Sequence, residues 1–168
     1  MCNLTSLCAE PMDILLGERG IKGRPFFEKC LRSRNRQATY FEALRLAVSG
    51  NLYRAIILME SNGTEDPYSV LAAAILSILS GDEEDAGMLL RIFAEKHAPL
   101  NSDRARSLGI CLTRQISSFC PSYFGRNISS FTYPPDLMPP CVFEHRQTPR
   151  ICNTCSIYWS ARRVYSML

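Results

Sequence analysis

The feature that most constrains the fold is a helix–turn–helix pattern that occurs twice between residues 39 and 118. Its two turns, Ser49-Gly50-Asn51 and Ser80-Gly81-Asp82, lie 31 residues apart. The flanking positions also correspond in type, pairing Ala43 with Ala74, Leu44 with Ile75, Val48 with Leu79, Ala55 with Ala86, Ile57 with Met88 and Leu58 with Leu89. Repetition at such a period is typical of stacked helical hairpins. We therefore expect an all-α fold of antiparallel helical hairpins, either a bundle or a short helical-repeat stack.

Capping residues and helix breakers divide residues 39–119, the expected helical core, into five helices. Thr39 followed by Glu42 forms a capping box at the start of the first. Asp66-Pro67 is a cap followed by proline at the first helical position, which begins the third helix. Val70–Leu79 is apolar on almost all sides, so this helix should be buried and central. The other boundaries are predicted at Gly50-Asn51, Asn62-Gly63, Gly81-Asp82, Ala98-Pro99 and Asn101 or Ser102.

The fourth predicted helix and its turn resemble a tetratricopeptide repeat. Gly81 stands in the turn and the small residue Ala86 follows five positions later, and Gly50 and Ala55 repeat that spacing. The resemblance implies an antiparallel helical stack, over residues 39–98, whose concave surface binds peptides. The chain departs from the family in its period of 31 residues and in lacking the aromatic and tyrosine of each first helix. A single helical bundle without a binding groove is the alternative.

The segments on either side of the core carry different signals. In residues 1–38, Gly17, Gly20, Gly23 and Pro25 predict irregular backbone packed on the core, with no helix longer than Pro11–Leu16. Residues 120–168 begin with a proline-rich connector that runs to Pro140. Net charge is +3 in the first segment, −3 in the core and +3 in the last. No secretory signal or membrane span is recognised, so we expect a cytoplasmic or nuclear protein.

The strongest functional signal is the spacing Cys141-x3-His145-x6-Cys152-x2-Cys155. Three thiols and an imidazole are the ligands of a structural zinc site, and Cys-x2-Cys can place two thiolates on one ion. In a reducing compartment, clustered cysteines favour metal over disulfides. Cys120 or Cys111 could instead supply the fourth ligand. Reduced thiols without metal, or four disulfides in an exported protein, are the other interpretations of the eight cysteines.

An amphipathic stripe after the cluster predicts a C-terminal helix packed on the zinc knuckle. Ile157, Ala161, Val164 and Leu168 lie on one side of it. We expect loss of the metal to unfold this tail and to leave the helical core folded.

These observations favour a non-catalytic adaptor that binds partner or host proteins through a helical surface. No Gly-x-Ser-x-Gly, His-Glu-x-x-His or phosphate-loop motif occurs, and His97 and His145 are the only histidines. Small cysteine-rich regulators of this kind resemble viral accessory proteins in style, without a shared motif. The alternative is a zinc-dependent nucleic-acid-binding regulator, with Tyr158 and Trp159 stacking on bases and with these arginines on phosphates: Arg32, Arg34, Arg36, Arg146, Arg150, Arg162 and Arg163.

Overall fold

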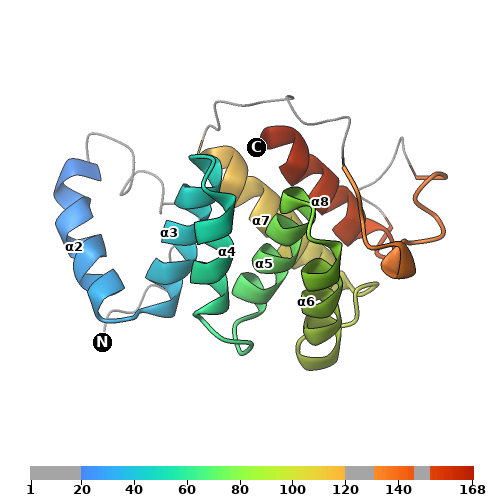
Figure 1. Ribbon diagram of the computed structural model, residues 1–168, viewed down its shortest axis with the longest axis horizontal. Coiled ribbons are helices and arrows are strands. Elements are labelled where there is room, and N and C mark those ends of the chain that lie inside the picture. Colours follow the sequence, from blue (N-terminus) through green and yellow to red (C-terminus); the bar gives the residue numbers. More distant parts are fainter. Residues whose placement is uncertain (1–19, 120–130, 146–151) are drawn as a thin grey trace.

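The computed structural model describes residues 20–119, 131–145 and 152–168, with side chains from Arg24 onwards. Within these ranges the regular structure is helical and no strand occurs (Figure 1). The elements are α2 (Gly20–Arg32), α3 (Arg36–Val48), α4 (Leu52–Glu60), α5 (Pro67–Ser80), α6 (Glu83–Lys96), α7 (Asp103–Ser118), the short 3-10 helix η1 (Pro135–Leu137) and α8 (Ser156–Met167).

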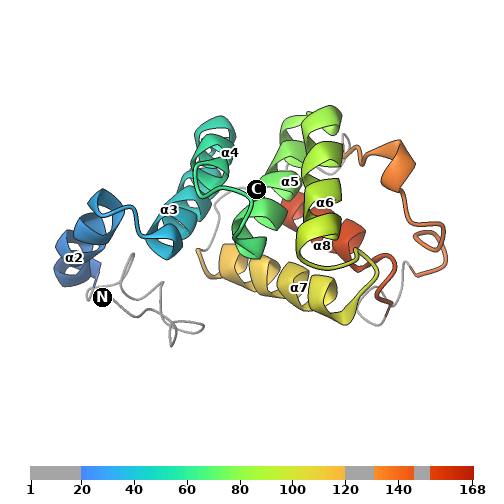
Figure 2. The same cartoon turned by 90° about the horizontal axis from the view of Figure 1, so that it is seen from below.

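The helices are arranged in two layers. Helices α3, α4, α5 and α6 pack in chain order, each against the next where a short turn joins them (Figure 1). Helices α7 and α8 pack on each other and on α5, and form the second layer (Figure 2). The predicted all-α architecture of antiparallel hairpins is therefore confirmed. None of the described helices has the length and apolarity that crossing a bilayer would require.

The turn glycines and three of the predicted caps have the expected roles. Gly50 and Gly81 adopt φ of +84° and +81°, a region that residues with a Cβ rarely enter. The Asp66 side chain accepts from the Ser69 N–H at 3.0 Å, and Asp82 and Ser102 cap α6 and α7 in the same way. These interactions satisfy backbone donors that a helix start leaves unpaired.

The predicted start of the first core helix was wrong. Helix α3 begins at Arg36, capped by Asn35, whose side chain accepts from the Ala38 N–H at 3.0 Å. Thr39 therefore lies inside the helix, and its hydroxyl donates to the Asn35 carbonyl. Glu42 is not part of a capping box because it pairs with Arg45 and Arg24. Although burial favours its neutral form, these arginines hold the pKa of Glu42 below its ordinary value.

The expectation of irregular backbone throughout residues 1–38 was also wrong, because residues 20–32 form helix α2 with Pro25 inside it. A proline costs the helix the hydrogen bond that its missing N–H would donate. Packing outweighs this cost: Phe27 and Cys30, three residues apart on one side, are buried, and α2 packs against α3. The predictions for residues 1–19, including a helix at Pro11–Leu16, lie outside the described residues.

Helix α5 is the centre of the core, as its apolar sequence predicts. Every residue from Ser69 to Ile78 is buried, with neighbours in α3, α4, α6, α7 and α8. The buried side chains of α8, including Ile157, Ala161 and Val164, belong to the same continuous apolar cluster. The C-terminal helix is therefore part of the core of the molecule, and not only a cover for the cysteine cluster.

Helices α7 and α8 approach closely at Gly109. A Cβ on this residue would lie 2.6 Å from Ser160 Oγ and 3.1 Å from Ser160 Cβ. We expect Gly109→Ala to lower the free energy of unfolding by about 1–3 kcal/mol, because the two helices must separate. Gly87→Ala is the matched control: its Cβ would meet nothing closer than 3.6 Å, so it should stabilise α6 by about 0.5–1 kcal/mol. Urea denaturation of both variants measures the change in the free energy of unfolding, which should have opposite signs in the two. Equal changes would contradict this packing.

The carboxylate of Glu60 on α4 interacts electrostatically with that of Asp85 on α6. Burial, together with the charge of Asp85, raises the pKa of Glu60 above its ordinary value. A raised pKa in the folded state means stability that is present at low pH and is lost as the pH rises through that pKa. Glu60→Gln should therefore be more stable than the wild type at pH 7, by less than about 1 kcal/mol. The advantage should shrink at pH 4, which urea denaturation at both pH values measures. A less stable variant at pH 7 would contradict the assignment.

Candidate metal centre

Two segments that are separate in the sequence supply the four predicted ligands. Cys141 and His145 lie in consecutive turns after η1, and Val142 between them is 2% exposed, which anchors the loop in the core. Cys152 and Cys155 come directly before α8. The Ser156 hydroxyl donates to the Asn153 carbonyl at 2.8 Å and closes the turn between these two cysteines and the helix. Both segments are therefore fixed by packing or by local hydrogen bonds.

The ligand atoms of all four residues lie within 4.8 Å of one another. Cys141 Sγ is 3.7 Å from Cys152 Sγ, and Cys155 Sγ is 3.5 Å from His145 Nδ1. Zinc bonds of about 2.3 Å to sulfur and about 2.0–2.1 Å to nitrogen give tetrahedral edges of about 3.8 Å between two sulfurs and about 3.6 Å between sulfur and nitrogen. The two short distances therefore match the edges of a zinc tetrahedron. Nδ1 of His145 is placed at a distance suited to a ligand atom.

The pKa values of the three thiols diverge within the cluster. A hydrogen bond from the backbone N–H of Cys155, assisted by that of Thr154, lowers the pKa of Cys152 to about 6. Burial and the neighbouring thiols raise the pKa of Cys155 to about 12 and also raise that of Cys141. Three thiolates repel one another at this separation, so the cluster accommodates one negative charge readily and two more only beside a cation. A divalent metal supplies that charge and favours the deprotonated ligands.

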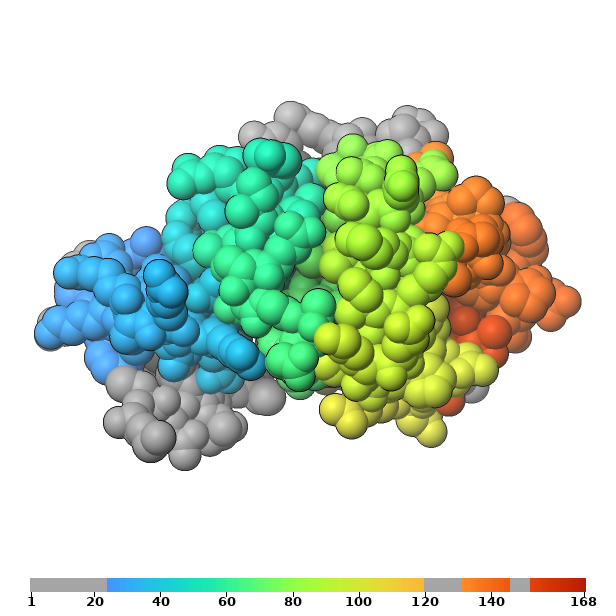
Figure 3. Space-filling view, turned by 60° about the horizontal axis from the view of Figure 1, so that its bottom comes forward, coloured from blue at the N-terminus to red at the C-terminus, as the bar shows by residue number. Residues whose placement is uncertain are grey.

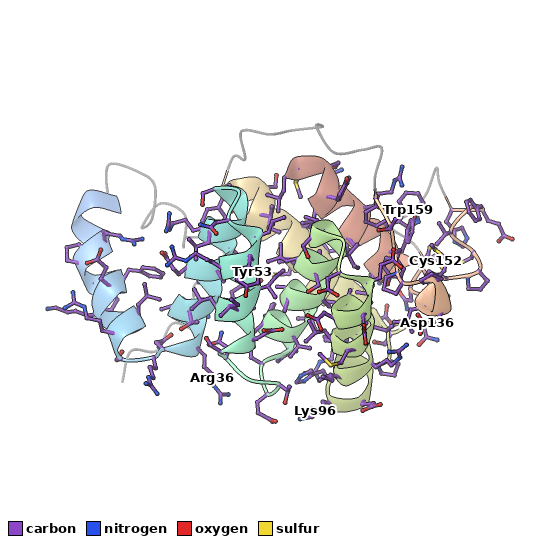
Figure 4. The ribbon with its side chains drawn as sticks, in the orientation of Figure 1. Arg36, Tyr53, Lys96, Asp136, Cys152 and Trp159 are labelled. Atoms are coloured by element: carbon purple, nitrogen blue, oxygen red, sulfur yellow. The ribbon has the colours of Figure 1, made fainter. Side chains whose placement is uncertain are left out.

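The cluster is also joined to the second helical layer. Asn153, between the two paired cysteines, donates from Nδ2 to Asp103 Oδ1 at 3.2 Å, and Asp103 is the first residue of α7. Asp103 also accepts from Arg106 at 2.8 Å. Figure 4 places Cys152 and Trp159 at the same end of the molecule, where α8 begins. Sequence reasoning did not identify Asn153 or Asp103, because the contact joins residues far apart in the chain.

Among the described residues, the other cysteines and the other histidine do not join the cluster. Cys30 is buried in α2 and Cys111 lies in α7, and the group of Cys141, His145, Cys152 and Cys155 is the one candidate metal site among the described residues. Cys120, the alternative ligand, lies outside them. His97 Nε2 is 2.8 Å from the Thr64 carbonyl oxygen, and its ring packs beside Phe93. His97 therefore joins α6 to the α4–α5 turn.

The described arginines of the nucleic-acid alternative do not form one surface. Arg32, Arg34 and Arg36 are exposed near the turn between α2 and α3, at one end of the molecule and apart from α8, which carries Arg162 and Arg163 (Figure 1). Arg146 and Arg150 lie outside the described residues.

The aromatic residues proposed to stack on bases in the nucleic-acid alternative pack against other side chains of the protein. Tyr158 is 8% exposed and packs against Phe131, Tyr133 and Trp159. The guanidinium of Arg162 lies over the Phe131 ring, 5.7 Å from its centre. Stacking of bases on Tyr158 would require this cluster to open.

Comparison of the chain with protein-family models, with curated proteins and with solved structures finds no match. The resemblance to tetratricopeptide repeats therefore rests on the residue pattern and on the hairpins themselves. The case for the metal centre rests on the geometry described above.

Proposed function

We propose that the protein is a non-catalytic adaptor with a structural Zn²⁺ ion at Cys141, His145, Cys152 and Cys155. The observation that supports it most is the convergence of three thiols and one imidazole, with two of the distances between them matching the edges of a zinc tetrahedron. Soft thiolates favour Zn²⁺ over Mg²⁺ or Ca²⁺, which prefer oxygen ligands. The ligand set is complete at four, whereas a catalytic zinc keeps one position open for water or substrate. The metal therefore serves structure.

The ion would cross-link the loop that contains Cys141 and His145 to the start of α8. Cys155 is 0% exposed and directly precedes that helix, so fixing its sulfur also fixes the helix. Because α8 packs on both α7 and α5, the metal would hold the second layer of the fold against the first. Binding energy from the site would thus stabilise the helical body.

The adaptor role is supported by a rigid helical surface with apolar side chains exposed on it. Tyr53 and Ile57 on α4 and Met88 on α6 are 75%, 47% and 46% exposed. Large apolar side chains grouped on neighbouring helices are a common feature of protein-binding surfaces.

Cross-linking and affinity purification of the tagged full chain test the adaptor role. We expect a protein partner in stoichiometric amount, and recovery of nothing above a mock purification would contradict it. A salt titration with single-stranded DNA and RNA separates the alternative. A nucleic-acid-binding regulator should lose affinity steeply as salt rises, whereas an adaptor should bind neither nucleic acid at physiological salt.

A further inference from the structure

Two equivalent stripes of side chains lie on α4 and α6, the helices that flank α5. Tyr53, Ile56 and Glu60 follow i, i+3, i+7 spacing on α4, and Asp85, Met88 and Ile92 follow the same spacing on α6. Residues at these spacings share one side of a helix. We call these six residues the α4–α6 face. Figure 3 shows α4 and α6 as two neighbouring ridges on one side of the molecule.

Contacts at the two ends place these stripes towards each other. Burial and the charge of Asp85 raise the pKa of Glu60, so these two positions face each other across the space between the helices. At the other end of α6, Lys96 Nζ lies 2.6 Å from Thr64 Oγ1, in the α4–α5 turn. Since α4 and α6 each pack antiparallel to α5, they run in the same direction, and the two stripes form the edges of one surface.

The remaining surface of α5 is covered by the chain itself. Helix α5 packs against α7 and α8 in the second layer, and its residues from Ser69 to Ile78 are buried. The α4–α6 face lies in the first layer, and Tyr53 and Met88 on it are 75% and 46% exposed. In the described part of the chain, this face presents exposed apolar side chains from two neighbouring helices, α4 of 9 residues and α6 of 14.

The segment of the chain that contains this face is acidic. Residues 52–96 contain 8 acidic and 3 basic side chains, a net charge of −5 in a chain of net charge +3. Two of the three cations are paired: Arg91 with Asp136 in η1, and Lys96 with Glu65 at 3.6 Å. The third, Arg54, is on α4 but outside its stripe. Glu60 ends α4 and Asp85 lies in the first turn of α6, and in the described part of the chain neither carboxylate forms an ion pair. The complementary surface is therefore basic.

We propose that the α4–α6 face binds a basic amphipathic helix of a partner protein. The apolar side of that helix would cover Tyr53, Ile56 and Met88, and its Lys or Arg side chains would reach Glu60 and Asp85. The proposal rests on the adaptor function and specifies its partner. A cation brought by the partner would offset the charge of Asp85, which adds to the larger effect of burial in raising the pKa of Glu60.

A model peptide tests the chemistry of this surface. The probe is a Leu/Lys amphipathic helix of about 15 residues, which spans about 22 Å, roughly the length of α6. Its control is a scrambled peptide of the same composition, which keeps the charge and loses the apolar side. We expect the amphipathic peptide to bind the full-length, zinc-loaded protein at least tenfold more tightly than the scrambled one in fluorescence anisotropy.

Two double variants locate the binding. Glu60→Lys/Asp85→Lys and Tyr53→Ala/Met88→Ala should each weaken binding at least tenfold. Phe26→Ala/Glu28→Lys on α2 is the matched control, since it removes an exposed apolar side chain and reverses a carboxylate elsewhere; it should change affinity less than twofold. Circular dichroism and zinc content, unchanged in all three, confirm that the fold and the metal site are intact.

Each other outcome overturns the proposal. Equal affinity for both peptides, or binding unaffected by the α4–α6 variants, would show that the surface does not recognise an amphipathic helix. A dimer in sedimentation analysis that Glu60→Lys/Asp85→Lys abolishes would show that a second copy of this chain covers the face. A natural partner captured equally by the wild type and by these variants would show that the partner does not bind the α4–α6 face. The adaptor function itself would not be contradicted by that result.

Discussion

Protein purified without a chelator is expected to carry a single zinc ion per chain, and the Cys152→Ser variant is expected to carry none. Cys152 is the thiol whose hydrogen bonds favour the thiolate, with a pKa of about 6, and its Sγ lies 3.7 Å from that of Cys141. A serine hydroxyl is a poor zinc ligand at neutral pH, so three ligands would remain. Elemental analysis by mass spectrometry measures the zinc content directly.

Cys111→Ser and Cys120→Ser are the matched controls for this experiment. Both remove one thiol that the sequence offers as an alternative ligand, and both should retain the full zinc content. Loss of zinc in Cys120→Ser with retention in Cys141→Ser would assign the fourth position to Cys120 and would contradict the ligand set proposed from the geometry.

Removal of the metal is expected to unfold the whole protein in one cooperative transition. The buried side chains of α8 share one apolar cluster with α5 and α7, so releasing α8 exposes the centre of the core. Structural zinc supplies on the order of 10–16 kcal/mol in small modules, comparable with the roughly 5–15 kcal/mol that stabilises a typical domain. This revises the sequence-based expectation that the helical core survives loss of zinc.

Trp159 provides a local probe for this prediction because it is the only tryptophan in the chain and lies on α8. Its fluorescence reports on the C-terminal helix, while far-ultraviolet circular dichroism reports on all the helices. In urea, the two signals of the zinc-loaded protein should change at the same midpoint, and chelator without urea should abolish the folded values of both signals together. A fluorescence transition that precedes the loss of helix would instead identify the tail as a separate unit.

Local sequence signals predicted the elements whose boundaries depend on local chemistry. Gly50 and Gly81 end helices because they adopt positive φ, and Asp66 and Ser102 cap helices through hydrogen bonds to residues three positions later. Helix α2 was missed because its stability comes from burying Phe27 and Cys30 on α3, which outweighs an internal proline. Local patterns do not contain that tertiary contribution.

The same distinction applies to the candidate metal site. The spacing of Cys141, His145, Cys152 and Cys155 was enough to predict which residues converge. The contact of Asn153 with Asp103 was not predictable, because it joins the cluster to a helix 50 residues earlier in the chain. Neither was the close approach of α7 and α8 at Gly109, since its cause is a neighbouring serine and not the backbone conformation of the glycine.

X-ray absorption at the zinc edge of the purified protein tests the central claim most directly. The spectrum should fit three sulfur atoms at about 2.3 Å and one nitrogen at about 2.0–2.1 Å. A shell of nitrogen and oxygen alone, or a protein that lacks zinc although prepared in its presence, would contradict the proposed zinc site that links the C-terminal helix to the helical body.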